Sequence, residues 1–186
     1  MGRIEFKPGT FLYPLPAVMV TSGNMENSNV LTVAWTGIVC SDPAMTYISV
    51  RKERFSHHLI KENMEFCINL TTEDLCFATD YVGVRSGDKE DKFEKMNLTK
   101  EKASIVKCPM IKESPVCIEC KVKEIKEMGS HDMFIAEIVA VNVDEKYMDE
   151  TGRFDMERCN LIAYSHGQYF TLGKKIGKFG YSVKKK

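Results

Sequence analysis

The sequence has no surplus of charge of either sign. It carries 26 Lys and Arg against 26 Asp and Glu, so its formal net charge at pH 7 is zero with neutral histidines. A nucleic-acid-binding protein needs an excess of positive charge to neutralise phosphates. The balance argues against nucleic acid as a partner, although it leaves room for a local basic patch.

Long apolar runs are also missing. No stretch approaches the roughly 20 apolar residues that cross a bilayer, and residues 1–6 contain no apolar segment typical of a secretion signal. Seven cysteines, an odd number, are scattered along the 186 residues, which fits free thiols in a reducing compartment. We expect a cytoplasmic protein with no membrane partner, folded as one domain over residues 1–186.

Several chemical fingerprints are absent. Neither G-x-G-x-x-G nor a P-loop occurs, so a Rossmann dinucleotide site is not supported. Cys117 and Cys120 form a C-x-x-C pair, but no second pair follows, and odd spacing in a strand directs the two sulfurs to opposite faces. We expect no metal site. No nucleophile–histidine signature or pair of carboxylates stands out either, which suggests that a cofactor carries any reaction.

Residues 29–43 form the stretch around which the rest of the chain is organised. Bulky apolar residues alternate there with small or polar ones, which predicts a single strand ending at Pro43. The stretch holds Trp35, the only tryptophan, while Thr32, Thr36 and Gly37 leave room beside it. A flat ligand would fit in that room. A core strand packed under a helix explains the pattern equally well.

Similar patterns predict a mainly β fold with short helices. The expected strands are 17–22, 29–42, 45–50, 65–70, 115–128, 133–143 and 168–172, and the expected helices are 56–63, 73–82 and a short piece around Phe93 and Met96. Ser56 is the predicted N-cap of the first helix. Strands in hairpin order favour a closed antiparallel barrel, Greek-key-like, with the helices inserted between strands.

Two polar clusters are candidate binding elements. Arg51, Lys52, Arg54 and Ser56 come together where a strand becomes a helix, which is a common arrangement for holding a phosphate. A solvated charged turn is the competing interpretation. Residues 129–132 predict a hairpin turn, in which His131 either donates to a ligand oxygen or is simply exposed.

These segments together resemble the flavin reductase-like family, and within it the flavoredoxin branch. The resemblance runs over nearly the whole chain, from about residue 14 to 182. It is carried, in order, by residues 16–22, 29–37, 54–60, 65–70, 80–83 and 129–137.

The resemblance implies an FMN-binding split β-barrel and a homodimer that holds FMN near the subunit interface. Asn29 and Trp35 would contact the isoalloxazine or ribityl part, and His131 would approach the flavin. Tyr164 would cover the ligand, and Cys40 would lie near the ring edge. The turn from Val50 to Ser56, which includes Arg51, Lys52 and Arg54, would wrap the phosphate. Lys92 would reach the phosphate or the ribityl chain.

The function implied is that of an FMN-dependent oxidoreductase of the flavin reductase or flavoredoxin type. Electrons would pass from a reduced donor, NAD(P)H or a protein electron partner, through FMN to an acceptor. Two alternatives stay open: a non-catalytic FMN carrier or flavin store reduced by a partner protein, and a split-barrel module with another cofactor such as haem or a deazaflavin.

Overall fold

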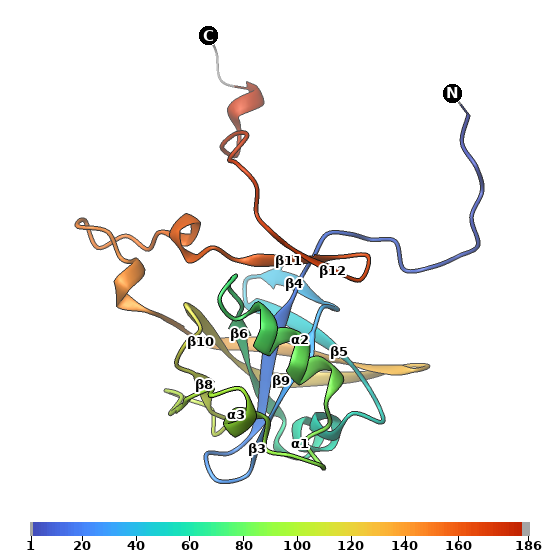
Figure 1. Ribbon diagram of the computed structural model, residues 1–186, viewed down its shortest axis with the longest axis vertical. Helices are drawn as coiled ribbons and strands as arrows, with labels where there is room; N and C mark the ends of the chain where they lie inside the picture. The colour runs from blue at the N-terminus through green and yellow to red at the C-terminus, as the bar shows by residue number, and fades with distance from the viewer. Residues whose placement is uncertain (1, 184–186) are drawn as a thin grey trace.

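The fold is a mainly antiparallel β structure with three short α-helices. A computed structural model describes residues 2–183 (Figure 1). Seven strands form the main sheet in the order β3-β2-β6-β9-β10-β5-β4. Their bounds are β2 Val18–Gly23, β3 Ser28–Val33, β4 Thr36–Ser41, β5 Ala44–Arg51, β6 Glu65–Leu70, β9 Val116–Met128 and β10 His131–Val143.

Smaller elements complete the chain. One small sheet joins β1 Leu15–Pro16, β11 Ile162–Ser165 and β12 Gln168–Thr171, and another joins β7 Lys100–Glu101 and β8 Met110–Ile111. The helices are α1 Phe55–Asn63, α2 Cys76–Val84 and α3 Lys92–Lys95, with 3₁₀ turns η1 Glu145–Tyr147, η2 Met156–Cys159 and η3 Tyr181–Val183. Residues 1 and 184–186 of the predicted domain lie outside the described part of the chain.

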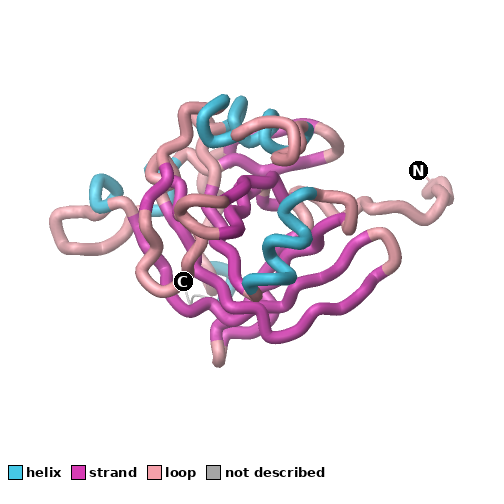
Figure 2. Tube along the Cα trace, turned by 90° about the horizontal axis from the view of Figure 1, so that it is seen from below, coloured by secondary structure: helices cyan, strands magenta, loops and turns pink. Residues whose placement is uncertain are grey.

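The main sheet combines local hairpins with distant pairings. Hairpins join β2 to β3, β4 to β5 and β9 to β10, whereas β2 pairs with β6, β6 with β9 and β5 with β10. Every one of these pairs is antiparallel, and the strands curve round rather than lie flat (Figure 2). The predicted mainly β, split-barrel class is therefore confirmed. The expectation of a closed barrel was wrong, because β3 and β4 are the two edges of the sheet and do not pair.

The organising stretch is two strands and not one. β3 ends at Val33 and β4 begins at Thr36, and these two strands lie at opposite edges of the main sheet. The amide of Ser49 donates to the carbonyl of Trp35 over 2.8 Å, which ties the crossing to β5. Alternation runs through both strands, so the local pattern contains no sign of the break.

The core fills the inside of the curved sheet. Phe66, Ile48 and Phe134 are fully buried there, and Ile60 of α1 packs into the same cluster. A second hydrophobic cluster lies under α2 and α3, around Met19 and Val82. Burying this much aliphatic and aromatic surface is the main favourable contribution to folding.

Two predicted helix starts were wrong. Arg54 occupies the N-cap position of α1 without a capping side chain, and Ser56 lies inside the helix, fully buried. α2 begins at Cys76 because the preceding residues form a separate turn, in which the Thr72 hydroxyl accepts from the amide of Leu75. Cap preferences are local, and here tertiary partners take the hydroxyl of Ser56 instead.

The 129–132 turn is shorter than predicted. Gly129 and Ser130 make the turn, with Gly129 at φ +74°, whereas His131 and Asp132 are the first residues of β10. Both therefore belong to the sheet and pair with the end of β5. This pairing places them beside the turn that leads into α1.

The cysteine pair of β9 divides between two clusters, as predicted from its odd spacing. Cys117 packs with Cys67 and Cys108, while Cys120 belongs to the main core. All seven cysteines are free thiols.

Candidate functional site

A cleft of about 440 Å³ opens where the chain crosses from β3 to β4. Its floor is formed by the end of β3 and the crossing itself, including Thr32, Ala34 and Trp35. Ser49 and Val50 of β5 form one side, and residues of α2 and of the β11–β12 hairpin form the other. The volume lies within the range of about 300–1,000 Å³ that is usual for small-molecule sites. Of the small residues predicted to leave room beside the tryptophan, Thr32 lines this cleft, whereas Gly37 faces the Tyr47 ring, 3.1 Å from where a Cβ would lie.

Aromatic side chains dominate one part of this cleft. The Trp35 ring is 39% exposed and lies with its centroid 4.4 Å from that of His131. The ring of Tyr164 contacts those of Tyr13, at 6.0 Å, and Tyr169, at 5.7 Å. Partly exposed rings in a concave site offer flat apolar faces to a ligand.

Tyr169 is also fixed by a carboxylate. Its hydroxyl donates to Asp80 Oδ1 of α2 over 3.2 Å, which joins the β11–β12 hairpin to the helix across the cleft. Burial raises the pKa of Tyr169, and the negative charge of Asp80 raises it further. The phenol therefore stays protonated at neutral pH and acts as a donor.

Two arginines bring positive charge to the cleft. Arg51 ends β5 and forms an exposed ion pair with Glu53 at 3.1 Å. Arg54 precedes α1, and among the described residues it forms no ion pair with a carboxylate. An uncompensated guanidinium beside a helix N-terminus favours an anionic group such as phosphate.

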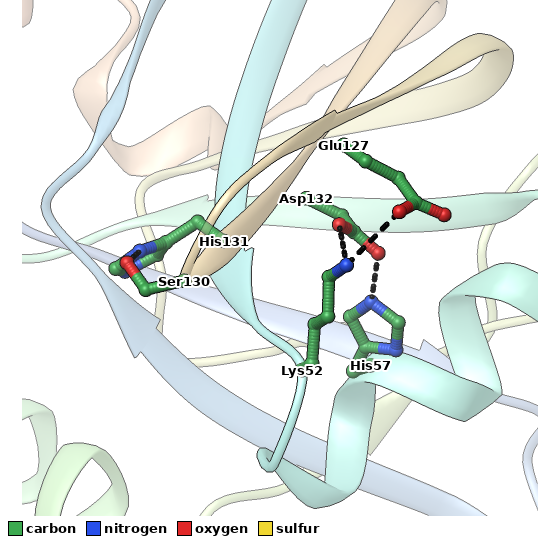
Figure 3. A network of polar contacts seen from close by, with 6 residues as sticks. All are labelled: Lys52, His57, Glu127, Ser130, His131 and Asp132. Carbon is green, nitrogen blue, oxygen red and sulfur yellow. Dashed lines mark hydrogen bonds and ion pairs between the residues drawn. The ribbon is translucent and has the colours of Figure 1, made fainter.

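A buried carboxylate fixes the turn that carries these arginines (Figure 3). Asp132 is 2% exposed; His57 Nε2 lies 2.8 Å from its Oδ2, and Lys52 Nζ lies 3.3 Å from its Oδ1. Lys52 also donates to Glu127 over 3.1 Å. Burial raises the pKa of Asp132, but the hydrogen bonds from His57 and Lys52 outweigh it, so the pKa lies below its ordinary value. The ionised group joins β5, α1 and β10 at one point.

His131 is neutral in this setting. Burial lowers its pKa, and the nearby Arg51 lowers it further. The hydroxyl of Ser130 lies 2.9 Å from His131 Nδ1. When that hydroxyl donates to Nδ1, the ring carries its proton on Nε2 and presents a donor there.

Three residues that were predicted to contact the phosphate or the flavin lie beneath a loop instead of in the cleft wall. Asn29 and Ser56 are buried, and Asn29 Nδ2 donates to Ser56 Oγ over 2.7 Å. Gly87 lies directly over them, since a Cβ there would be 2.3 Å from Asn29 Oδ1. Lys92 is 2% exposed and donates to the carbonyls of Val82, at 2.9 Å, and Arg85, at 3.2 Å.

The cleft thus collects six of the eleven residues that the sequence pointed to: Trp35, Val50, Arg51, Arg54, His131 and Tyr164. Asn29, Ser56 and Lys92 lie behind it, and Lys52 belongs to the Asp132 network. Cys40 is on the edge strand β4, where its thiol contacts the carbonyl of Asp42 at 3.4 Å. The assignment of these eleven residues to a cofactor site stays a prediction.

Sequence reasoning missed several cleft residues. Tyr13 and Tyr169 come from the N-terminal lead-in and the last strand, and neither belongs to a recognisable motif; Asp80 of α2 begins the 80–83 segment of the resemblance, which assigned it no role in the site. His57 has no role assigned from the sequence, whereas in the structure its Nε2 lies 2.8 Å from Oδ2 of the Asp132 carboxylate. Only the pairing of distant segments brings these residues to one place.

The fold and the cleft together define a class of protein: an antiparallel split barrel whose cleft offers aromatic faces and unpaired positive charge. The model of the flavin reductase-like domain matches residues 10–173. The chain therefore belongs to the flavin reductase-like domain family.

Individual relatives agree with this family. An uncharacterized protein from Archaeoglobus fulgidus is 34% identical over 161 residues, which cover 87% of this chain and 89% of the relative. The structure resembles flavoredoxin of Desulfovibrio vulgaris (Miyazaki F), with a TM-score of 0.90, 29% identity and coverage of 98% and 100% of the two chains. It also resembles flavoredoxin from Methanosarcina acetivorans, with a TM-score of 0.88, 27% identity and coverage of 99% and 100%. The resemblance to the flavoredoxin branch is confirmed.

Lys92 generates a prediction for the pH dependence of stability. Burial and, to a lesser extent, the nearby Arg54 lower the pKa of Lys92 to about 8, while Glu90 opposes the shift. In the unfolded chain the lysine keeps its proton up to a pKa of about 10.4, so stability rises with pH between those two values. Between pH 7 and pH 9.5, the free energy of unfolding of the wild type should rise by about 1–2 kcal/mol more than that of Lys92→Met.

Urea unfolding at several pH values measures this difference. Cysteines and tyrosines titrate in both proteins, so their contributions to the pH dependence of stability cancel in the comparison. Lys95→Met, which removes an exposed lysine from the same helix, is the matched control. Parallel stability profiles for wild type and Lys92→Met would contradict the prediction.

Proposed function

We propose that the protein is an FMN-binding oxidoreductase that passes electrons from a reduced donor to an acceptor. The observation that carries this proposal is the cleft in which an unpaired arginine and exposed aromatic rings face one space. A flavin mononucleotide presents the complementary groups, a phosphate and a flat ring system. Membership of the flavin reductase-like family supports the same ligand.

The phosphate is assigned to the turn between β5 and α1. Arg54 and Arg51 supply charge there, and the N-terminal amides of α1 supply donors. Asn29 and Ser56 lie directly behind this turn, and their mutual hydrogen bond holds the start of α1 against β3. These two residues therefore position the turn, and Lys92 secures the end of α2 opposite it.

The ring system is assigned to the crossing between β3 and β4. Trp35 and Tyr164 provide aromatic surface, and the backbone at Ala34 and Ser49 lines the same wall. His131, neutral at physiological pH, presents a hydrogen-bond donor without adding charge. A bound flavin would supply two-electron redox chemistry, which none of the side chains in the cleft offers by itself.

A carrier that depends on a partner protein is the second candidate function. Arg51 and Arg54 are the only Lys or Arg side chains that line the described cleft, and the phosphate of FMN would engage them. A nicotinamide dinucleotide carries further phosphates, and the cleft has no second group of cations for them. Reduction by a protein would require no such group.

We also propose that the protein is a cytoplasmic homodimer. The terminal segments run away from the body of the fold on the same side (Figure 1), and they expose Phe6, Ile176 and Phe179. A second copy of the chain would cover such side chains. No described helix is long and apolar enough to cross a membrane, and free thiols at all seven cysteines fit a reducing compartment.

Sedimentation equilibrium tests the homodimer directly. The chain mass is 21.2 kDa, so the expected particle has twice that mass. A particle of 21.2 kDa at micromolar concentration would contradict the homodimer.

The function is tested by an absorbance spectrum followed by anaerobic addition of NADH and NADPH in turn. We expect the purified protein to take up FMN and to show a flavin spectrum. Rapid bleaching by either nucleotide supports a reductase and identifies its donor, whereas a spectrum that stays oxidised supports the carrier. A protein that does not take up FMN would refute both.

Arg54→Ala should weaken FMN binding, because the variant loses a charge-assisted contact to phosphate. The expected loss is about 1.5–3 kcal/mol, or roughly 10- to 150-fold in Kd. Quenching of flavin fluorescence on binding gives the affinity. Arg153→Ala, which removes an exposed arginine far along the chain, is the control. Equal FMN affinity for wild type and Arg54→Ala would remove this turn from the site.

A further inference from the structure

A second pocket shares a wall with the cleft. It has a volume of about 480 Å³, and Trp35, Ser49 and His131 line both spaces. The N-terminal lead-in forms its far side through residues 9–12 and Leu15, and the tip of the β9–β10 hairpin adds Met128 and Met133. A ligand in this pocket would lie against the same tryptophan and histidine that the cleft presents to FMN.

The second pocket contains no formal charge. None of its lining residues is Asp, Glu, Lys or Arg. Burial and Arg51 together keep the pKa of His131 low, so its imidazole is neutral as well. An anion would lose hydration there without gaining a cation, which is costly in a partly desolvated space. The pocket therefore discriminates against carboxylates and phosphates, including nicotinamide dinucleotides.

The lining is apolar and aromatic, with a few hydrogen-bonding groups. Phe11, at 63% exposed, and Met128, also at 63%, lie open to an incoming molecule, as does the indole of Trp35. Aromatic rings and methionine sulfurs both make favourable contacts with flat π systems. Tyr47 and Ser49 add hydroxyl groups, and His131 adds an imidazole, each able to donate to an oxygen atom.

We propose that this second pocket binds a small, uncharged aromatic carbonyl compound. Its ring would pack among the aromatic and methionine side chains, and its oxygen would accept from a hydroxyl or from His131. The binding does not depend on a flavin, because the second pocket is formed by the protein's own residues. It therefore stands or falls separately from the proposed function.

The single tryptophan makes the test specific, since Trp35 lines the second pocket and is the only indole in the chain. Flavin-free protein is titrated with acetophenone and, separately, with benzoate, and the quenching of Trp35 fluorescence is corrected for inner-filter effects. The two probes share a ring and nearly the same size but differ in charge. We expect saturable quenching by acetophenone and at least about tenfold weaker binding of benzoate, because the carboxylate is desolvated without a partner.

Two variants locate the bound probe. Met133→Lys places a cation in the second pocket alone. It should weaken the binding of acetophenone and strengthen the binding of benzoate, each by about fivefold or more. Arg54→Ala alters the cleft alone and should leave acetophenone affinity unchanged. Opposite responses of the two probes to Met133→Lys also rule out simple misfolding as their cause.

Three outcomes would overturn the proposal. These are linear quenching without saturation, equal affinity for the two probes, and acetophenone binding that responds to Arg54→Ala but not to Met133→Lys. If the protein takes up no FMN and yet binds acetophenone as described, the proposed function fails and this inference holds. If the protein binds FMN but shows one of the three outcomes, this inference fails and FMN binding, on which the proposed function rests, holds.

Discussion

The amide of Ser49 donates to the carbonyl of Trp35, and the cleft depends on this hydrogen bond. The bond ties the crossing segment to β5 at the point where the chain passes from one edge of the main sheet to the other. With the crossing held there, the indole stays partly exposed at the surface of both pockets. A sheet closed edge to edge would leave no such crossing and no cleft beside it.

The Asp132 carboxylate performs the second positioning task. A buried charge is costly unless it is paired, and here His57 of α1 hydrogen-bonds Oδ2 while Lys52, from the turn before α1, forms an ion pair with Oδ1. Since the network spans β5, α1 and β10, it sets where the arginine-bearing turn lies relative to the sheet (Figure 3). It also fixes the backbone beside His131. One ion-pair network thus places the arginine-bearing turn and the shared histidine together.

Buried polar residues behind the cleft explain why some predicted ligands are not in its wall. Asn29 and Ser56 satisfy each other, and Lys92 satisfies the carbonyls at the end of α2. Each is a polar group with its partner inside the protein, as burial requires. The residue types expected of a phosphate site are therefore present around the turn, but part of the set holds the scaffold. Arg54 remains the group whose charge faces the open space.

Local patterns determined much of this protein. Alternation and turn residues predicted β6 with its observed bounds and the β9–β10 hairpin to within a few residues, since these signals act between neighbours in the chain. The motif order also identified the family, and it pointed to Arg54 and Trp35. The break at residues 34–35 was invisible, because the alternation continues through it.

Only the tertiary structure decided the rest. Whether Ser56 caps a helix or binds Asn29 depends on a partner 27 positions away. Likewise, Tyr13, Asp80 and Tyr169 reach the cleft only after non-local strand pairing brings their segments together. The sequence by itself determined the elements and their chemistry, because propensity and periodicity are local. Which side chains share a cavity was decided by long-range packing, because burial and ion pairing act between segments that no local pattern connects.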